Sequence, residues 1–432
     1  MRIRPARRIK GQLRVPGDKS ISHRAAIISA LAHGSSKISS FATGADCAAT
    51  VACLKALGVA ITAADGNLIV NGVGRHGFKR SDKPLDCGNS GSTMRMLAGV
   101  LAGQNFTSTL VGDDSLSMRP MRRIVAPLEA MGATVQSHAG KPPLTIIGSD
   151  SLKAIAYELP VSSAQVKSGV LLAALNAAGV TRVSESSVKS RDHTERMLQW
   201  FGAALSQQDT GGTYVVSLDG PQTLAARDIS IPGDISSAAF FVAAAGLLPN
   251  SDLVIDNVGL NPTRTAFLSV FESLGLTVKT KNVREESNEP LGSIHVAGRQ
   301  FPLQSQTTLS GSNSAQVIDE LPLLAVLGSQ TPGGMEIRDA EELRLKESDR
   351  IAATVKNLRA MGATVKEFDD GMSVNPAQLK GARLESNGDH RITMAFTIAA
   401  LIAAGESEID DAECVRVSFP DFFEVLESIV ER

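Results

Sequence analysis

The stretch PGDKSISHRAAIISALA, residues 16–32, decides the fold, because its pattern returns five more times along the chain. A small polar loop opens a segment that is apolar on nearly all sides, and such a segment predicts a helix buried inside a domain. The copy IPGDISSAAFFVAAAGL begins at Ile231, and its Pro232 stands 216 residues after Pro16, half of the 432-residue length. The remaining four copies start at Cys87, Val161, Asn313 and Asn387.

A second motif follows each of the first five copies and indicates where an outer helix ends. It is an apolar–Gly–apolar step that leads into a short strand, as in KALGVAI and EAMGATV. Glycine is expected there, because many helices end in a residue with left-handed backbone geometry. One such pair could arise by chance, but two motifs interleaved along the whole chain indicate a true repeat. The five glycines are Gly58, Gly132, Gly202, Gly275 and Gly362.

Together the two motifs predict six units of strand, buried helix, strand, amphipathic helix and strand pair, a βαβαββ pattern in an α/β (α+β) protein. The last unit, FPDFFEVLESIVER, ends the chain with no strands after it, and residues 1–16 can supply them. We therefore expect a discontinuous first lobe of residues 1–17 plus 232–432 and a second lobe of residues 18–231. The chain length also suggests roughly two domains.

Composition argues against several classes of protein. The formal net charge is −2, whereas nucleic-acid binders usually carry a basic surplus. The four cysteines form no C-x-x-C pair, which indicates reduced thiols in a cytoplasmic protein. The basic N-terminus lacks the apolar run of a signal peptide, and the longest apolar runs are too short to span a membrane. Neither a dinucleotide-binding glycine motif after a strand nor a P-loop motif occurs.

Small, cationic and acidic residues gather at the predicted helix starts. A helix N-terminus presents free N–H groups and a partial positive charge, so with Lys and Arg nearby it suits phosphate and carboxylate groups. Taken singly, these residues could be solvated charges, helix caps or packing residues, and we prefer packing for His23 and His390. The set comprises Lys19, Ser20, Arg24, Asn89, Gly91, Ser92, Arg119, Ser163, Gln165, Asp319, Lys346, Glu347, Arg350 and Arg391.

The segments PGDKSISHR, LDCGNSGSTMR, SSAQVKS, LKESDR and GDHR resemble the signature of the 5-enolpyruvylshikimate-3-phosphate (EPSP) synthase family, and the resemblance extends from Val15 to Phe423. It implies two lobes of three units each around parallel buried helices, with the active site in the cleft between the lobes. It also implies transfer of the enolpyruvyl group of phosphoenolpyruvate to the 5-hydroxyl of shikimate-3-phosphate, without cofactor or metal. This step belongs to aromatic amino-acid biosynthesis, and we expect glyphosate to compete with phosphoenolpyruvate.

The same resemblance implies residues for each substrate. Shikimate-3-phosphate would be held by Lys19, Ser20, Arg24, Ser163, Gln165, Asp319 and Lys346, with Ser190 as a further candidate for its phosphate. Phosphoenolpyruvate would be held by Lys19, Gly91, Arg119, Gln165, Arg350 and Arg391. Much of the family has a lysine where Glu413 stands here, so no basic residue is assigned to that loop, although Arg416 lies nearby.

The reaction requires proton transfers at two places on the substrates. Asp319 is our candidate for the base that takes the 5-hydroxyl proton. Glu347, with Lys19 beside it, is our candidate for the acid that protonates the methylene carbon and for the base that later removes a methyl proton. The arginines would position the anions and stabilise developing charge.

Two alternative functions have recognisable sequence features. A related transferase that acts on UDP-N-acetylglucosamine would show Asn after Lys19, where Ser20 stands, and usually a Cys in the loop that here reads GDDSLSMRP. A non-catalytic sensor of phosphorylated metabolites would be expected to lose Asp319 or Glu347, and both are present. We expect small-molecule substrates, a monomer, and neither a nucleic-acid nor a membrane partner.

Overall fold

The computed structural model describes residues 1–186, 188–299 and 307–432. The chain forms two compact units, each with its own hydrophobic core. Unit 1 comprises residues 1–16, 232–284 and 290–432, and unit 2 comprises residues 17–231 and 285–289. Both ends of the chain therefore belong to unit 1.

Unit 2 contains three buried helices and, outside them, three longer helices and one short helix. The buried helices begin at polar side chains, because Asp18, Ser90 and Ser163 each accept a hydrogen bond from a backbone N–H of the first turn. The buried helices are α1 (Lys19–Leu31), α3 (Gly91–Ala102) and α6 (Ala164–Ala174). The others are α2 (Ala45–Ala56), α4 (Asp114–Ser117), α5 (Arg122–Ala130) and α7 (His193–Trp200).

Each repeat of unit 2 builds a sheet in which a parallel strand pair is extended by an antiparallel hairpin. One sheet has the order β6 (Leu85–Asp86), β7 (Thr107–Val111), β9 (Lys141–Ile147), β8 (Thr134–His138). The second has the order β10 (Ala156–Glu158), β11 (Gly179–Ser186), β13 (Thr213–Gly220), β12 (Leu205–Thr210). The third has the order β14 (Leu224–Ala225), β3 (Ala32–Ser39), β5 (Asn67–Val73), β4 (Ala60–Ala64), and β15 (Ile229–Ser230) also pairs with β3.

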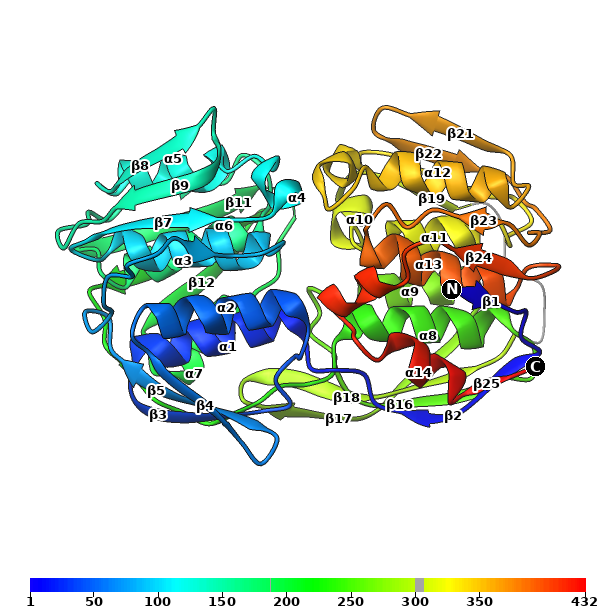
Figure 1. The fold of residues 1–432 in the computed structure, drawn as a ribbon, viewed down its shortest axis with the longest axis horizontal. Helices are drawn as coiled ribbons and strands as arrows, with labels where there is room; N and C mark the ends of the chain where they lie inside the picture. Colours follow the sequence, from blue (N-terminus) through cyan, green and yellow to red (C-terminus); the bar gives the residue numbers. More distant parts are fainter. Residues whose placement is uncertain (187, 300–306) are drawn as a thin grey trace. The chain divides into compact units, whose positions relative to one another are not determined.

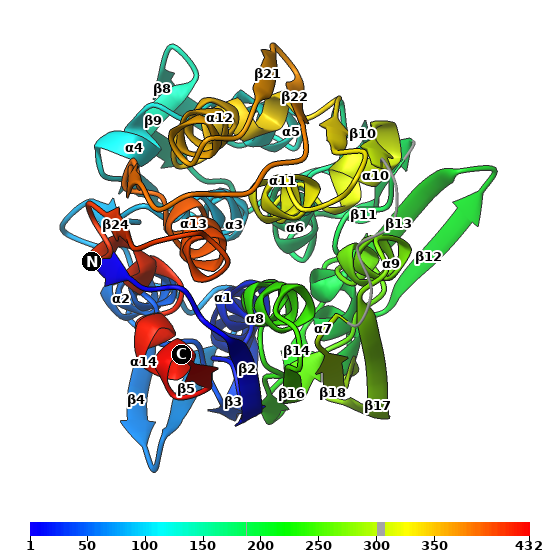
Figure 2. The ribbon, with the colours of Figure 1, turned by 90° about the vertical axis from the view of Figure 1, so that its right-hand side faces the viewer.

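Unit 1 repeats this plan around its own three buried helices. Figure 2 looks nearly along them and shows α8, α11 and α13 end-on, with strands on the outside. The buried helices are α8 (Ile235–Leu247), α11 (Leu321–Gly328) and α13 (His390–Leu401). The others are α9 (Ala266–Ser273), α10 (Gly311–Gln316), α12 (Arg350–Ala360) and α14 (Phe422–Glu427), with 3₁₀ turns η1 (Glu341–Leu345) and η2 (Glu413–Val417).

Two sheets of unit 1 keep this strand order, and the third has three strands, of which one comes from the N-terminus. One sheet is β19 (Thr307–Leu309), β20 (Met335–Ile337), β22 (Gly371–Val374), β21 (Val365–Phe368). The second is β17 (Thr277–Glu286), β18 (Glu289–Ala297), β16 (Asp252–Gly259), β2 (Arg8–Leu13), β25 (Val430–Glu431). The third is β1 (Arg2–Ile3), β24 (Ser407–Ile409), β23 (Arg383–Leu384).

The predicted α/β (α+β) fold of repeated βαβαββ units, three around each set of buried helices, is confirmed (Figure 1). The predicted helix ends are also left-handed: Gly132 and Gly202 have φ angles of 105° and 90°. One detail of the last unit was wrong. A strand does follow the last helix, because β25 pairs with β2, and a 2.6 Å ion pair joins Arg8 to Glu431. A two-residue strand is too short to show a hydrophobic period.

The tip of the β17–β18 hairpin belongs to unit 2, although the sequence placed all of residues 232–432 in the first lobe. Glu289 Oε1 lies 2.7 Å from His193 Nδ1, and the carbonyl of Asn288 accepts a hydrogen bond from Arg196 at 3.2 Å. Glu289 and His193 are buried, so these contacts fix the tip on α7. No periodic signal in the sequence marks such a contact.

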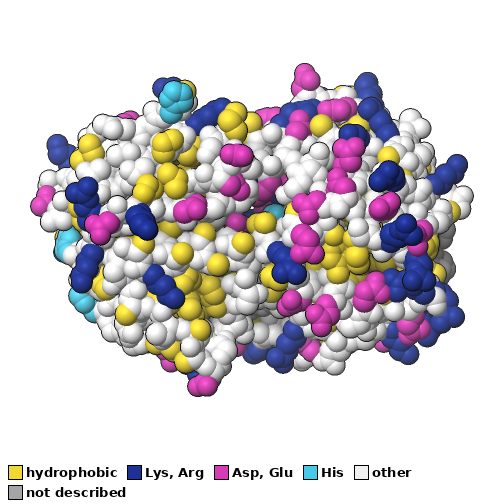
Figure 3. Space-filling view, in the orientation of Figure 1, with side chains coloured by type: hydrophobic (Ala, Val, Ile, Leu, Met, Phe, Trp, Pro, Cys, Tyr) yellow, Lys and Arg dark blue, Asp and Glu magenta, His cyan; other side chains and the backbone are white. Residues whose placement is uncertain are grey.

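Charge is spread over the surface. On the face shown in Figure 3, basic and acidic side chains are interspersed. This agrees with the formal net charge of −2, so a site for an anion would depend on a local cluster of basic side chains. Among the described helices, none combines the length and the apolar content needed to cross a bilayer.

Candidate functional site

The first cluster lies where the buried helices of unit 2 begin. Gln165 of α6 donates a hydrogen bond to the Ser92 hydroxyl of α3 at 2.8 Å. Arg24 of α1 donates to the carbonyl of Ala164 at 3.5 Å and to the Ser168 hydroxyl at 2.8 Å. Three helix N-termini with their partial positive charges therefore meet in one place. We call Lys19, Ser20, Arg24, Gly91, Arg119, Ser163 and Gln165 the unit 2 cluster.

Lys19 is the first residue of α1, and its side chain is oriented by an ion pair with a neighbouring helix. Its Nζ lies 2.9 Å from Asp46 Oδ2 at the start of α2. The carbonyl of Ser20 accepts a hydrogen bond from Arg24 at 2.8 Å, and Arg24 is almost fully buried. Asp46 was not among the predicted site residues, because an acidic residue at a helix start also has the ordinary role of stabilising that helix end.

Gly91 begins α3 beside an arginine that the sequence analysis also missed. Arg95, one turn later on α3, donates to Gln165 Oε1 at 2.6 Å and to the carbonyl of Pro120 at 3.1 Å. A Cβ atom added at Gly91 would lie 2.6 Å from Arg95 Nη1. Gly91 and Arg95 share one helix face by their four-residue spacing, which is the signal that could have identified Arg95.

Arg119 connects two loops of the unit 2 cluster. It is buried, and its Nη2 donates to Asn89 Oδ1 at 2.6 Å and to the Ser115 hydroxyl at 3.1 Å. Asn89 in turn donates to Asp113 at 2.7 Å. Arg119 is thus a fixed interior group, and the interpretation as a freely solvated surface arginine is wrong.

A buried lysine supports the loop that carries Ser190. Lys167 of α6 lies 2.8 Å from Glu185 and 2.9 Å from Glu195, and all three side chains are fully buried. Burial disfavours the charged lysine, but the two carboxylates outweigh it and raise the pKa of Lys167. Its Nζ donates to the Ser190 carbonyl at 3.4 Å, and Glu185 accepts the Ser190 N–H at 3.2 Å. Ser163 caps the start of the same helix.

The second cluster lies where α11, α12 and α13 of unit 1 begin, and Asp319 is at its centre. Asp319 Oδ1 lies 3.4 Å from Lys346 Nζ and 3.5 Å from Arg350 Nη1, and its Oδ2 lies 3.9 Å from Arg391 Nη2. One carboxylate therefore faces three cations. We call Asp319, Lys346, Glu347, Arg350 and Arg391 the unit 1 cluster.

Arg350 is the buried organiser of the unit 1 cluster, with 1% of its side chain exposed. Its Nε and Nη2 donate to the two oxygens of Asp389 at 2.8 and 3.2 Å, and its Nη2 donates to Glu347 at 2.6 Å. Burial opposes the charge, but the carboxylates, Asp389 first, raise the pKa of Arg350. Burial likewise opposes ionisation of Asp389, yet Arg350 outweighs it and lowers the pKa of Asp389.

His23 packs beside the unit 2 cluster, whereas the C-terminal loop is exposed. His23 is fully buried with its Nδ1 2.7 Å from Thr50 Oγ1, and burial, with Lys19 and Arg24 nearby, lowers its pKa well below the usual value. His23 is thus a neutral packing residue, as expected. Glu413 and Arg416 form an exposed ion pair with each other in η2.

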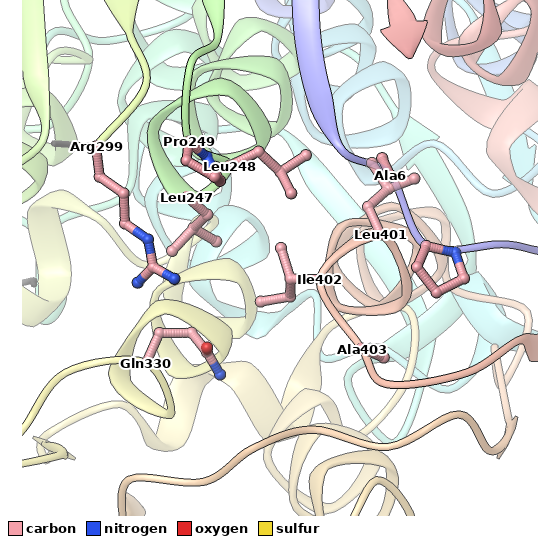
Figure 4. A pocket seen from close by; sticks show the side chains of 10 residues that line it. Ala6, Leu247, Leu248, Pro249, Arg299, Gln330, Leu401, Ile402 and Ala403 are labelled. Atoms are coloured by element: carbon pink, nitrogen blue, oxygen red, sulfur yellow. The ribbon is translucent and has the colours of Figure 1, made fainter. Parts of the chain in front are cut away.

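A small pocket of about 140 Å³ lies at the C-terminal ends of the buried helices α8 and α13 of unit 1. Figure 4 shows it near the last residues of α8 and α13, where Leu247 and Leu401 line it. The starts of these helices are about 18 Å away at 1.5 Å per residue. Its polar lining side chains are Arg299 and Gln330, so it contains none of the sequence-predicted site residues.

Comparison with known proteins gives one consistent result. A family model described as EPSP synthase (3-phosphoshikimate 1-carboxyvinyltransferase) matches residues 3–426. A protein named 3-phosphoshikimate 1-carboxyvinyltransferase from Koribacter versatilis is 50% identical, with 100% of this chain and 99% of that protein aligned. The protein of the same name from Solibacter usitatus is 48% identical, with 100% and 99% aligned.

Solved structures agree with the sequence relatives. An EPSP synthase from Acinetobacter baumannii has a TM-score of 0.85 and 39% identity, and the match covers 99% of this chain and 98% of that one. The enolpyruvyl transferase NikO from Streptomyces tendae has a TM-score of 0.76 at 18% identity, with 99% and 96% covered. The second likeness shows the fold alone.

Proposed function

Because this chain belongs to the EPSP synthase family, we propose that the unit 2 cluster and the unit 1 cluster together bind the two substrates of that family's reaction. The chain is a transferase of the shikimate pathway to the aromatic amino acids: it moves the enolpyruvyl group of phosphoenolpyruvate to shikimate-3-phosphate and releases phosphate. The resemblance noted in the sequence is thereby confirmed. The clusters themselves carry the site proposal, because each combines helix N-termini with buried cations.

An active site in the cleft between the lobes is part of this proposal, and it rests on the family resemblance. Shikimate-3-phosphate would contact Lys19, Ser20, Arg24, Ser163 and Gln165 of unit 2 and Asp319 and Lys346 of unit 1. Phosphoenolpyruvate would contact Lys19, Gly91, Arg119 and Gln165 of unit 2 and Arg350 and Arg391 of unit 1. Each substrate therefore has assigned residues in both clusters.

Proton transfer is assigned to the carboxylates of the unit 1 cluster. Asp319 takes the 5-hydroxyl proton as that oxygen attacks the central carbon of phosphoenolpyruvate. Glu347 protonates the methylene carbon and later removes a methyl proton as phosphate leaves, and Lys19 is assigned to assist it. Asp319 and Glu347 lie against Arg350, at 3.5 and 2.6 Å. An arriving anion would compete for these cations and release the carboxylates for proton transfer.

The assay that tests the function follows phosphate release with both substrates present. Release that requires shikimate-3-phosphate supports the assignment. Release with UDP-N-acetylglucosamine instead would point to the alternative transferase, and binding without release would point to a sensor. We also propose a monomer, because one chain supplies both clusters, and a cytoplasmic location, because all four cysteines are free thiols. Analytical ultracentrifugation and cell fractionation test these two points.

Arg119→Ala and Arg391→Ala should each raise the KM for phosphoenolpyruvate by about ten- to a hundredfold, the range for loss of charge-assisted hydrogen bonds. Both arginines are fixed by neighbouring groups, Arg119 by Asn89 and Arg391 by the carbonyl of Asp319 at 2.9 Å. The affinity for shikimate-3-phosphate alone, measured by calorimetry, is the control. A comparable loss there would move these arginines to the other substrate.

Gly91→Ala should raise the inhibition constant of glyphosate about tenfold or more, the scale for forcing a methyl group into filled space. The new Cβ would lie 2.6 Å from the end of the Arg95 side chain. That end can shift, so the fold should tolerate the methyl group, but the methyl group leaves less space for a ligand beside residue 91. Phosphoenolpyruvate is shorter than glyphosate and should lose much less affinity. Both constants are measured in wild type and variant, and equal weakening would mean that Gly91 does not discriminate by ligand length.

A further inference from the structure

Glu320 carries a carboxylate to which the substrate assignments give no role. It stands immediately before α11 and is 4% exposed. A carboxylate at a helix start commonly caps its own helix. Glu320 makes no such hydrogen bond. Instead, its Oε1 accepts from the Ser236 hydroxyl of α8 at 2.5 Å and from Arg391 Nη1 of α13 at 3.3 Å.

A buried chain of contacts holds Glu320 in this position. The Ser236 hydroxyl accepts a hydrogen bond from Arg264 Nη2 at 2.8 Å, which directs its own hydrogen to Glu320. Arg264 Nη2 also lies 3.2 Å from Asp234 Oδ1, and the Asp234 N–H donates to the carbonyl of Pro16 at 2.8 Å. The four residues Asp234, Ser236, Arg264 and Glu320 are between 2% and 7% exposed. Such a charge-assisted network fixes the groups that it contains.

The same contacts decide how Arg391 is oriented. Its Nη1 donates to the carbonyl of Asp319 at 2.9 Å and to Glu320, so one edge of the planar guanidinium is held. Its Nη2 stays 3.9 Å from Asp319 Oδ2, a long contact for an ion pair. Without Glu320, a guanidinium that can turn would close this contact, because Asp319 is then the nearest opposite charge.

We propose that Glu320, held by Ser236, is a positioning residue that keeps Arg391 available to phosphoenolpyruvate and out of a full ion pair with Asp319. The proposal rests on the proposed function only through the assignment of Arg391 to that substrate. Glu320 is assigned to neither substrate and acts through Arg391, so its loss should raise the KM for phosphoenolpyruvate while leaving the dissociation constant of shikimate-3-phosphate alone close to wild type.

The test compares Glu320→Ala, Glu320→Gln and Ser236→Ala. Glu320→Ala should raise the KM for phosphoenolpyruvate by about tenfold or more, as expected for loss of one charge-assisted hydrogen bond. Glu320→Gln should raise it less, because the amide oxygen still accepts from Ser236 and Arg391. Ser236→Ala should lie between them, because Glu320 keeps its charge but loses its anchor. Binding of shikimate-3-phosphate alone is measured by calorimetry for each.

Ser329→Ala is the matched control. Ser329 is also a fully buried serine of unit 1, but its hydroxyl donates to the carbonyl of Val326 at 2.7 Å and does not reach Arg391. It should leave the KM for phosphoenolpyruvate unchanged. An equal rise in Ser329→Ala would mean general destabilisation and would overturn the proposal.

The outcomes separate this inference from the proposed site. If Arg391→Ala raises the KM for phosphoenolpyruvate but Glu320→Gln and Ser236→Ala do not, the positioning role is overturned and the site stands. These two conservative variants decide the matter even where Glu320→Ala fails to fold. If Arg391→Ala itself leaves that KM unchanged, the assignment of Arg391 fails, and the positioning role fails with it.

Discussion

Asp319→Asn should bind shikimate-3-phosphate and yet lose about 10²- to 10⁴-fold in kcat, the usual contribution of a general base. The amide has nearly the same size, so it can remain beside Lys346 and Arg350, which lie 3.4 and 3.5 Å from the carboxylate. It cannot accept the 5-hydroxyl proton. The kcat is measured by phosphate release at saturating substrates, and binding is measured by calorimetry.

Asp370→Asn is the control for this substitution. Asp370 belongs to the same unit and accepts a hydrogen bond from Arg338 at 3.1 Å, but it has no contact with the unit 1 cluster. It should keep the wild-type kcat. Near-normal turnover in Asp319→Asn, with binding unaltered, would show that another group takes the proton.

Arg350→Met should destabilise unit 1 by about 3–5 kcal/mol, the cost of leaving a buried charge without its partner. Its loss removes the cation and two hydrogen bonds from the fully buried Asp389, which keeps the hydrogen bonds from the Ser348 hydroxyl and the Arg391 N–H. Glu347 loses its 2.6 Å contact as well. Urea unfolding followed by circular dichroism at neutral pH measures the effect.

The pH dependence of the free energy of unfolding should show whether Asp389 causes the destabilisation of Arg350→Met. In the wild type the pKa of Asp389 is lowered, so its stabilisation is present above the unfolded pKa of about 3.9 and is lost as pH falls through the folded value. In Arg350→Met the guanidinium that lowers the pKa of Asp389 is gone, while burial and Glu347 still raise it, so this pKa should be higher than in the wild type. The variant's deficit should then shrink as the pH falls and Asp389 takes up a proton.

Arg344→Met provides the matched comparison for Arg350. Arg344 also pairs with two carboxylates of unit 1, Asp349 at 2.6 Å and Glu367 at 3.0 Å, but its side chain is 27% exposed. Its pairs should contribute at most about 1 kcal/mol, as solvent-screened pairs do. A double variant Arg350→Met, Asp389→Asn should recover part of the lost stability. Equal losses for Arg344 and Arg350 would contradict the account of a buried charge left alone.

The sequence predicted those parts of the fold that every repeat shares. An apolar helix such as residues 235–247 can only be buried, and a helix that ends at Gly132 needs left-handed backbone geometry. Because these constraints recur in each unit, the residues that meet them recur at regular intervals in the sequence. The two-residue strand β25 and the hairpin tip at Glu289 arise from single contacts and leave none.

The sequence predicted which charged residues belong to the candidate site, but it predicted only some of the contacts between them. Lys19, Arg119 and Asp319 stood out because charged groups at helix starts suit anions. Asp46 and Glu320 did not, because an acidic residue at a helix start already has an ordinary explanation. Asp46 contacts Lys19 and Glu320 contacts Arg391, each on a neighbouring helix. The packing of the helices decides which side chains meet, and the local sequence does not show it.

The structure of the protein bound to shikimate-3-phosphate tests the central claim most directly. The account predicts one ligand in contact with both clusters. Its phosphate should lie near Ser163 and Ser190, and its 5-hydroxyl should lie within hydrogen-bond reach of Asp319. A ligand held by only one of the two clusters, with its 5-hydroxyl away from Asp319, would contradict the assignment of a shared site and of the base.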